Sequence, residues 1–88
     1  MATGRILLAE DDAGVADLVS ELLTEEGYEV QLARTGSDAL DALQADSFNL
    51  ALIDLYIPLL DGRAVLEAVR AQPIETPIVI MTASTLAA

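Results

Sequence analysis

The stretch LALIDLYIPLLDG, residues 50–62, decides the fold because its apolar run ends on a single carboxylate, Asp54. Residues 50–53 are all apolar, which is typical of a strand that is covered on both faces of a sheet. Residues 58–62 carry strong turn signals, so the strand stops close to Asp54. Burying an unpaired carboxylate is costly, and Asp54 must therefore reach a polar site or meet a cation.

Apolar periodicity alternates between strand and helix along the rest of the chain. Continuous apolar runs predict covered strands, whereas the strict alternation of YEVQLA predicts a half-exposed strand at a sheet edge. The predicted strands are residues 5–9, 28–33, 49–54 and 78–81. The predicted helices run from Ala13 toward Gly27, over 35–46 and over 63–71.

Local signals support the helix boundaries. Asp12 can cap the first helix, and Gly27 suits its C-terminal stop. Thr35 and Asp38 form a capping pattern at the start of the second helix. The first helix also has an apolar stripe, and this stripe should pack inward while the acidic residues on the opposite side face solvent. The stripe consists of Val15, Leu18, Val19, Leu22 and Leu23.

The element order βαβαβαβ predicts a single α/β domain. Strands that alternate with helices form a parallel sheet with helices on its faces and right-handed crossovers. Such sheets bind ligands at the carboxyl ends of their strands, so the residues after each strand are the candidates. They are Glu10, Asp11 and Asp12 after the first strand, Asp54 at the end of the third and Thr82 after the fourth. A threonine in that place often only closes a strand and caps a helix.

The two aspartates after the first and third strands predict a metal site. If these strands are neighbours, Asp11 and Asp54 face each other across about 4.8 Å. Carboxylates that close repel each other unless a proton or a cation lies between them. Mg²⁺ prefers carboxylate, carbonyl and water oxygens, and with Mg²⁺ bound Asp54 would be a nucleophile. Glu10 is interpreted as a solvated neighbour of the pair, and Asp12 and Asp61 as helix caps or turn formers.

Composition excludes several classes of function. The 88 residues include 15 acids, four arginines and no lysine, histidine or cysteine, for a net charge of −11. That charge repels phosphate backbones and anionic lipids, so we expect no direct nucleic-acid binding and no membrane docking. The lack of cysteine excludes a disulfide framework and a thiolate metal site. With no secretory signal and no apolar run near about 18 residues, we expect a cytoplasmic location.

Three segments resemble the signature segments of response-regulator receiver domains in two-component signalling. They are ILLAEDDAG at 6–14, LALIDLYIPLLDG at 50–62 and PIVIMTAS at 77–84, in the family's order and spacing. The resemblance implies a flavodoxin-like sheet with strand order 2-1-3-4-5. It also implies a phosphorelay receiver that accepts a phosphoryl group on Asp54, with Mg²⁺, from a sensor histidine kinase or a phosphotransfer protein.

The resemblance assigns a role to each candidate residue. Asp11 and Asp54 would be the side-chain ligands of Mg²⁺, with Glu10 close by and the Tyr56 carbonyl as a further protein ligand. Thr82 would be the switch hydroxyl that moves toward the aspartyl phosphate. The chain would then not be an enzyme, apart from promoting the phosphorylation of its own Asp54.

The chain departs from the family's pattern after its fourth strand. Residues 1–88 are interpreted as one incomplete receiver domain, without the fifth strand and the last helices. The family's lysine, which holds the phosphoryl oxygens, has no counterpart because the chain contains no lysine. The fourth strand would be a bare apolar edge, so we expect self-association through it, with Val79 and Ile80 exposed. Residues 82–88 are interpreted as the first turn of another helix.

Two alternatives stay open from the sequence. The missing lysine favours a pseudo-receiver that binds partners without phosphorylation, whereas the intact acids at 10, 11 and 54 count against it. An aspartyl-nucleophile phosphohydrolase would place a second aspartate two residues after the first, where this chain has Tyr56. The G-x-G-x-x-G pattern of dinucleotide binding is absent, so a Rossmann oxidoreductase is not supported.

Overall fold

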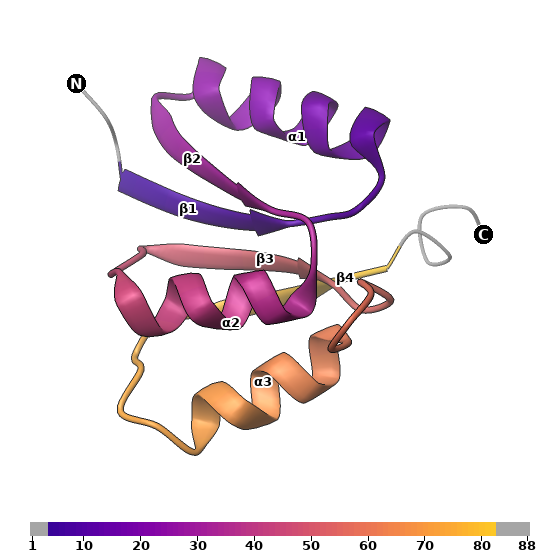
Figure 1. The fold of residues 1–88 in the computed structure, drawn as a ribbon. Coiled ribbons are helices and arrows are strands. Elements are labelled where there is room, and N and C mark those ends of the chain that lie inside the picture. The colour runs from indigo at the N-terminus through magenta and orange to yellow at the C-terminus, as the bar shows by residue number, and fades with distance from the viewer. Residues whose placement is uncertain (1–3, 83–88) are drawn as a thin grey trace.

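The computed structural model describes residues 4–82, which form a parallel sheet with helices on both faces (Figure 1). The strands are β1 (Gly4–Ala9), β2 (Tyr28–Ala33), β3 (Leu50–Asp54) and β4 (Ile78–Met81). The helices are α1 (Ala13–Glu25), α2 (Gly36–Ala45) and α3 (Gly62–Arg70). The predicted order and type of all seven elements are confirmed. No helix among residues 4–82 is long and apolar enough to cross a bilayer.

The strand order is β2-β1-β3-β4, with every neighbouring pair parallel. This order places β1, which acids follow, and β3, which ends on Asp54, side by side at the centre of the sheet. The register pairs Ala9 with Ile53 and Asp54 with Met81. The alternating strand β2 lies at an edge, as its sequence pattern predicted. The order is the flavodoxin-like one over the described strands.

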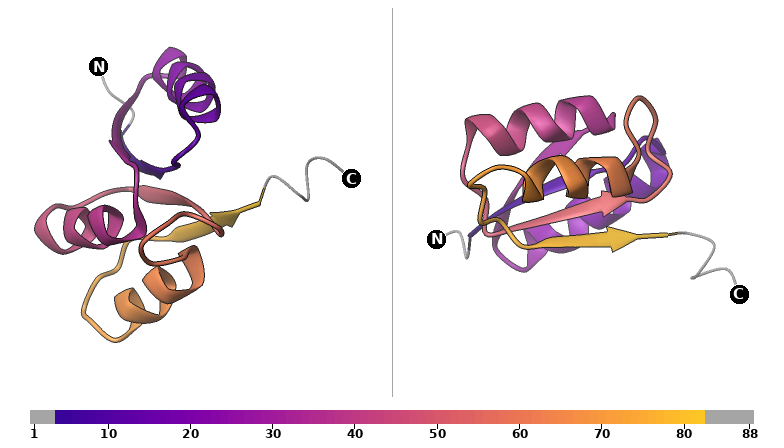
Figure 2. Two further views of the ribbon diagram at one scale, coloured as in Figure 1. Left: turned by 45° about the vertical axis from the view of Figure 1, so that its right-hand side comes forward. Right: turned by 90° about the horizontal axis from the view of Figure 1, so that it is seen from below.

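The two faces of the sheet are covered unequally. Helices α2 and α3 cover one face and pack against each other, whereas α1 lies alone on the other face over β2 and β1 (Figure 2). The face beneath α2 and α3 carries the main apolar cluster, in which strand residues meet helix residues. Its fully buried members include Leu7, Ala9, Ala51, Ile53 and Val65. The four strand residues among them alternate along β1 and β3, as the pleat of a strand requires.

Side-chain caps begin all three helices. The Asp12 Oδ1 accepts a hydrogen bond from the Val15 amide at 3.0 Å, and the Thr35 Oγ1 accepts one from the Asp38 amide at 3.0 Å. The Asp61 Oδ1 accepts from the Ala64 amide at 2.8 Å. These bonds satisfy amides that the helix itself leaves without partners. The capping interpretations of Asp12, Thr35 and Asp61 are therefore confirmed.

The apolar stripe of α1 is partly buried along one edge only, at Val19 and Leu23, which corrects the sequence-based prediction. Val15, Leu18 and Leu22 are 40%, 59% and 53% exposed, while Ala16 is fully buried. The helix packs mainly on β2, and within residues 4–82 no second helix lies beside it on that face (Figure 2). The stripe is wide enough to pack against both the sheet and a second helix, but among the described residues it packs against the sheet alone.

The fourth strand corrects a second prediction. Val79 is 48% exposed, as expected, but Ile80 is partly buried and packs against the main cluster. Successive side chains of a strand point to opposite faces, so the two residues cannot share one exposed patch. The predicted helical turn at 82–88 lies outside the described residues except for Thr82.

Candidate functional site

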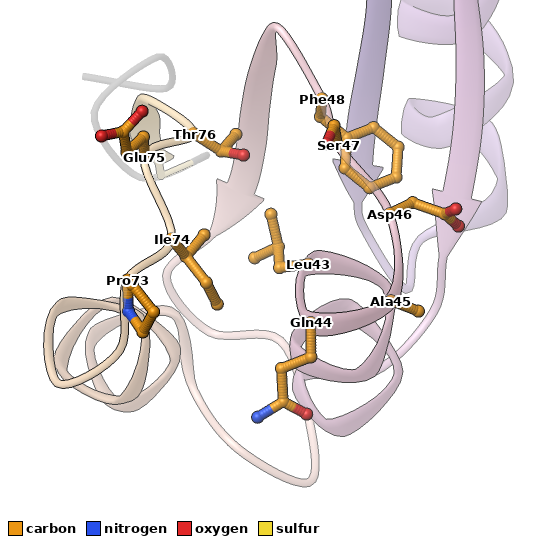
Figure 3. A pocket seen from close by; sticks show the side chains of 10 residues that line it. All are labelled: Leu43, Gln44, Ala45, Asp46, Ser47, Phe48, Pro73, Ile74, Glu75 and Thr76. Carbon is orange, nitrogen blue, oxygen red and sulfur yellow. The ribbon is translucent and has the colours of Figure 1, made fainter.

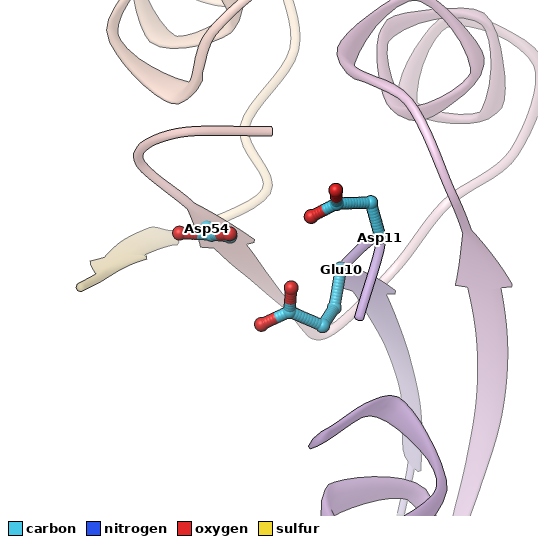
Figure 4. Close-up of side chains that lie close together, drawn as sticks. All are labelled: Glu10, Asp11 and Asp54. Carbon is cyan, nitrogen blue, oxygen red and sulfur yellow. The ribbon is translucent and has the colours of Figure 1, made fainter. Parts of the chain in front are cut away.

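The candidate site lies at the carboxyl ends of the two central strands. Asp54 is the last residue of β3, and Glu10 and Asp11 directly follow β1. Because β1 and β3 are paired in parallel with Ala9 opposite Ile53, their ends meet at the same edge of the sheet. Figure 4 shows Glu10 and Asp11 projecting from the end of β1 toward Asp54.

The three side chains form one carboxylate cluster. Glu10, Asp11 and Asp54 each offer an oxygen, and these oxygens lie within 4.8 Å of one another. The structure therefore brings together the two aspartates that the sequence expected to face each other. Three like charges at this distance repel, which stores electrostatic energy that a cation can release.

Glu10 is the most enclosed member of the cluster, contrary to the expectation of a solvated neighbour. The residue is 7% exposed, and its Oε2 accepts a hydrogen bond from the Asp12 amide at 3.2 Å. Burial raises the pKa of Glu10, and the Asp54 and Asp11 carboxylates raise it further. The Asp12 amide acts in the opposite direction, because a hydrogen bond to the ionised form stabilises the charge.

The donor set of the cluster fits a small hard dication. Arg5 pairs with Glu29, and Arg63 pairs with Glu67, both away from the cluster, so neither of these arginines neutralises it. Carboxylate oxygens are the ligands that Mg²⁺ prefers, and three of them leave coordination positions for water or a phosphoryl oxygen. The chemistry of these residues therefore supports a magnesium site.

The loop that follows Asp54 folds back on it. The Tyr56 amide donates to Asp54 Oδ1 at 3.2 Å, and the Ile57 amide donates to the Asp54 carbonyl at 3.2 Å. Ile57 is buried, whereas the Tyr56 side chain is 70% exposed. Gly62 closes the loop, since a Cβ there would lie 2.9 Å from the Asp54 carbonyl oxygen. Tyr56 thus lies beside the cluster, and its carbonyl as a metal ligand stays a prediction.

Thr82 lies at the same edge of the sheet as the cluster. It directly follows Met81, the register partner of Asp54, and is partly buried. Its role as a switch hydroxyl stays a prediction.

Sequence reasoning missed two contacts that hold this loop against α2. The Gly36 amide donates to the Pro58 carbonyl at 3.0 Å, and the Ser37 hydroxyl donates to the Leu59 carbonyl at 2.9 Å. The sequence carries one signal of a close contact: Gly36 is the first residue of α2, a position where a side chain is normally tolerated. That signal does not identify the partner, because the contact spans more than 20 residues of chain.

A separate pocket of about 470 Å³ opens at the other end of the sheet (Figure 3). It lies between the end of α2, the connection into β3 and the connection from α3 to β4. Its lining includes Leu43, Phe48 and Ile74, with the acids Asp46 and Glu75. No residue of the carboxylate cluster lines it, so the pocket and the candidate metal site are distinct.

Comparison with known proteins agrees with the fold. Residues 6–87 match the family described as the response regulator receiver domain. The transcriptional regulatory protein DltR of Streptococcus agalactiae is 38% identical over 79 residues, covering 90% of this chain and 35% of DltR.

Two solved structures are similar along nearly the whole chain. The receiver domain of the Pseudomonas aeruginosa sensor histidine kinase PA1611, with magnesium coordinated in its active-site cleft, gives a TM-score of 0.91 at 31% identity. That match covers 97% of this chain and 71% of the other. The response regulator TrrA of Thermotoga maritima, in complex with Mg²⁺ and BeF, gives 0.85 at 31% identity, covering 94% and 70%.

The chain belongs to the response regulator receiver domain family of two-component systems. It has the flavodoxin-like fold of its structural neighbours over the described residues. It spans about a third of the length of the curated relatives that it matches, which are transcriptional regulators.

Proposed function

We propose that this chain is a phosphorelay receiver that accepts a phosphoryl group on Asp54. The observation that carries the proposal is the cluster of Glu10, Asp11 and Asp54 at the carboxyl ends of β1 and β3, in a member of this family. The donor would be a phosphohistidine of a sensor histidine kinase or a phosphotransfer protein. We assign residues 1–88 to this one domain.

Phosphoryl transfer requires Asp54 to act as a nucleophile. One of its carboxylate oxygens would form a bond to phosphorus while the bond from phosphorus to the histidine nitrogen breaks. The histidine ring keeps that electron pair. The Tyr56 amide, which donates to Asp54 Oδ1, would fix the rotation of the carboxylate for this attack.

Mg²⁺ would be held by Asp11, Asp54 and the Tyr56 carbonyl, with Glu10 close by. When bound, the ion would neutralise the charge of the transferring oxygens. The magnesium in the PA1611 receiver and the Mg²⁺–BeF complex of TrrA support this assignment. Thr82, one residue beyond the register partner of Asp54, would be the hydroxyl that responds to the phosphoryl group.

A second copy of the chain is a candidate partner through β4. The Pro77 carbonyl accepts a hydrogen bond from the Ala51 amide of β3, and the Met81 carbonyl accepts one from the amide of Leu55, the residue after β3. Alternate residues of a strand direct their backbone groups to opposite sides, so the N–H and C=O groups of Ile78 and Ile80 point away from β3. Among the described strands β4 lies at the sheet edge, and IVIM carries no charge or proline. Unpaired backbone groups on an apolar edge favour strand pairing with another chain.

A pseudo-receiver that binds partners without phosphorylation is the second candidate. The observation in its favour is that the chain has no lysine, so the cation that the family uses on the phosphoryl oxygens is not among its residues. Electrostatic stabilisation would then depend on Mg²⁺ alone, and transfer would be slow.

Phosphorylation with a small phosphodonor distinguishes the two candidates. The chain is incubated with acetyl phosphate, with and without Mg²⁺, and the product is mapped by mass spectrometry. We expect slow, Mg²⁺-dependent modification at Asp54 that Asp54→Asn abolishes. Modification only at another residue, such as Asp61, or none at all in a folded chain, would contradict the receiver proposal and favour the interaction module.

A further inference from the structure

The loop between β3 and α3 is held in an unfavourable backbone conformation. Leu59 has φ of 63° and Leu60 has φ of 151°, values that side-chain-bearing residues rarely adopt. Such conformations persist only where surrounding contacts enforce them. The two residues lie between Tyr56 and Gly62, in the loop that returns from Asp54.

The first turn of α2 supplies the enforcing contacts. The Gly36 amide donates to the Pro58 carbonyl at 3.0 Å, and the Ser37 hydroxyl donates to the Leu59 carbonyl at 2.9 Å. Two consecutive loop carbonyls therefore bind two consecutive helix residues. The Gly36 amide is one that the helix leaves without an internal partner.

Gly36 is required by close approach and not by its own backbone angles. A Cβ at this position would overlap the Leu60 carbonyl oxygen and lie 2.6 Å from the Leu60 carbonyl carbon. Both atoms belong to the loop backbone, which cannot rotate away as a flexible side chain can. Any side chain at position 36 must therefore displace the loop.

The other end of the loop is joined to the carboxylate cluster. The Gly62 amide donates to the Leu55 carbonyl at 3.0 Å, and the Tyr56 amide donates to Asp54 Oδ1 at 3.2 Å. Pro58, which α2 binds, is two residues from Tyr56. A displacement of the loop tip is thus transmitted through a short, closed segment to the amide that contacts Asp54.

We propose that Gly36 and Ser37 are positioning residues for the magnesium site. Through the β3–α3 loop they set the place of the Tyr56 main chain against Asp54, so the affinity for Mg²⁺ depends on the first turn of α2. Neither residue belongs to the carboxylate cluster. This inference rests on the proposed function for the metal itself.

The test is the dissociation constant of Mg²⁺, measured by calorimetry on the whole chain well below its melting transition. Ser37→Ala removes one hydrogen bond and should weaken Mg²⁺ binding about threefold to tenfold. Ser37→Thr keeps the hydroxyl and should bind like the wild type. Gly36→Ala should weaken binding more than Ser37→Ala.

Gly14→Ala is the matched control for Gly36→Ala. Gly14 also lies in the first turn of a helix, but a Cβ there would meet only the Asp12 side chain, at an ordinary 3.4 Å. Its Mg²⁺ affinity should stay within about twofold of the wild type, the scale expected for a surface substitution. Equal losses in both glycine variants would overturn the inference, because a general helix effect would then explain them.

A second readout needs no metal. Hydrogen exchange of the Tyr56 amide in the metal-free chain should accelerate in Ser37→Ala and not in Ser37→Thr. If Ser37→Ala leaves the exchange of the Tyr56 amide unchanged, or lowers the melting temperature without changing the Mg²⁺ affinity, the inference is overturned. Gly36 and Ser37 would then only stabilise the fold. A folded wild type that binds no Mg²⁺ but shows faster Tyr56 exchange in Ser37→Ala would instead contradict the proposed metal site.

Discussion

The bodies of the central strands and their carboxyl ends follow opposite physical rules. Leu7, Leu8 and Ile53 in the bodies of β1 and β3 are fully buried and apolar, which stabilises the sheet. One to four residues further along the chain, at the ends of these strands, carboxylate oxygens of Glu10, Asp11 and Asp54 lie within 4.8 Å of one another. The contrast teaches that the sheet provides the stability that an electrostatically unfavourable site requires.

The largest effect should come from the strand bodies. Ile53→Ala removes a side chain that is fully buried beneath α2 and α3 and should lower the free energy of unfolding by about 2–5 kcal/mol. Leu18→Ala, at a position that is 59% exposed on α1, should change it by less than about 0.5 kcal/mol. Urea denaturation of both variants measures the difference. Equal losses would show that the exposed edge of α1 is covered in solution.

The next largest effect should come from Mg²⁺ at the strand ends. Only the folded chain assembles the carboxylates, so Mg²⁺ at 100 times its dissociation constant should stabilise it by about 2.7 kcal/mol. Asp11→Asn should lose most of this gain, whereas Asp41→Asn, an exposed acid on α2, should keep it. Thermal melts with Mg²⁺ or EDTA measure the gain. A melting temperature that ignores Mg²⁺ in the folded wild type would contradict the metal site.

Without metal, Glu10→Gln should raise the melting temperature slightly, whereas Asp11→Asn lowers the stability that Mg²⁺ provides. Because burial raises the pKa of Glu10 in the folded chain, the folded state binds the proton more readily than the unfolded state. Stability from this group is therefore present below its unfolded pKa and is lost as the pH rises through the folded value. In EDTA, Glu10→Gln should melt higher than the wild type at pH 7, with less difference at pH 4. A lower melting temperature at pH 7 would mean that the buried charge is not destabilising.

The smallest effect on stability is expected at β4, which is an edge strand of the described sheet and not a central one. Val79 is 48% exposed, so Val79→Lys should leave the unfolding free energy of the monomer within about 0.5 kcal/mol. It should nevertheless reduce self-association, because paired edges would bring like charges together. Sedimentation at several salt concentrations measures this, with Leu18→Lys as the equally charged control. A wild type that stays monomeric at high protein concentration and high salt would contradict pairing through β4.

The sequence by itself determined the local features and the place of the site. Helix caps at Asp12, Thr35 and Asp61 depend on contacts within three residues, so their side chains were sufficient to predict them. The convergence of Asp11 and Asp54 followed from a general rule, since parallel strands end at the same edge of a sheet. Periodicity also predicted that β2 lies at an edge.

Only the tertiary structure decided how deeply each group is buried and what holds the loop beside Asp54. Glu10 is enclosed although its neighbour in sequence, Asp11, is exposed, because burial depends on which elements pack around a residue. Leu18 and Leu22 share a stripe with the partly buried Val19 and Leu23 yet remain exposed, since β2 and β1 cover only one side of the helix. Gly36 meets Leu60 across a separation in sequence that no local pattern spans. Such contacts arise when distant segments pack, and the free energy of that packing is not encoded in any single stretch of the chain.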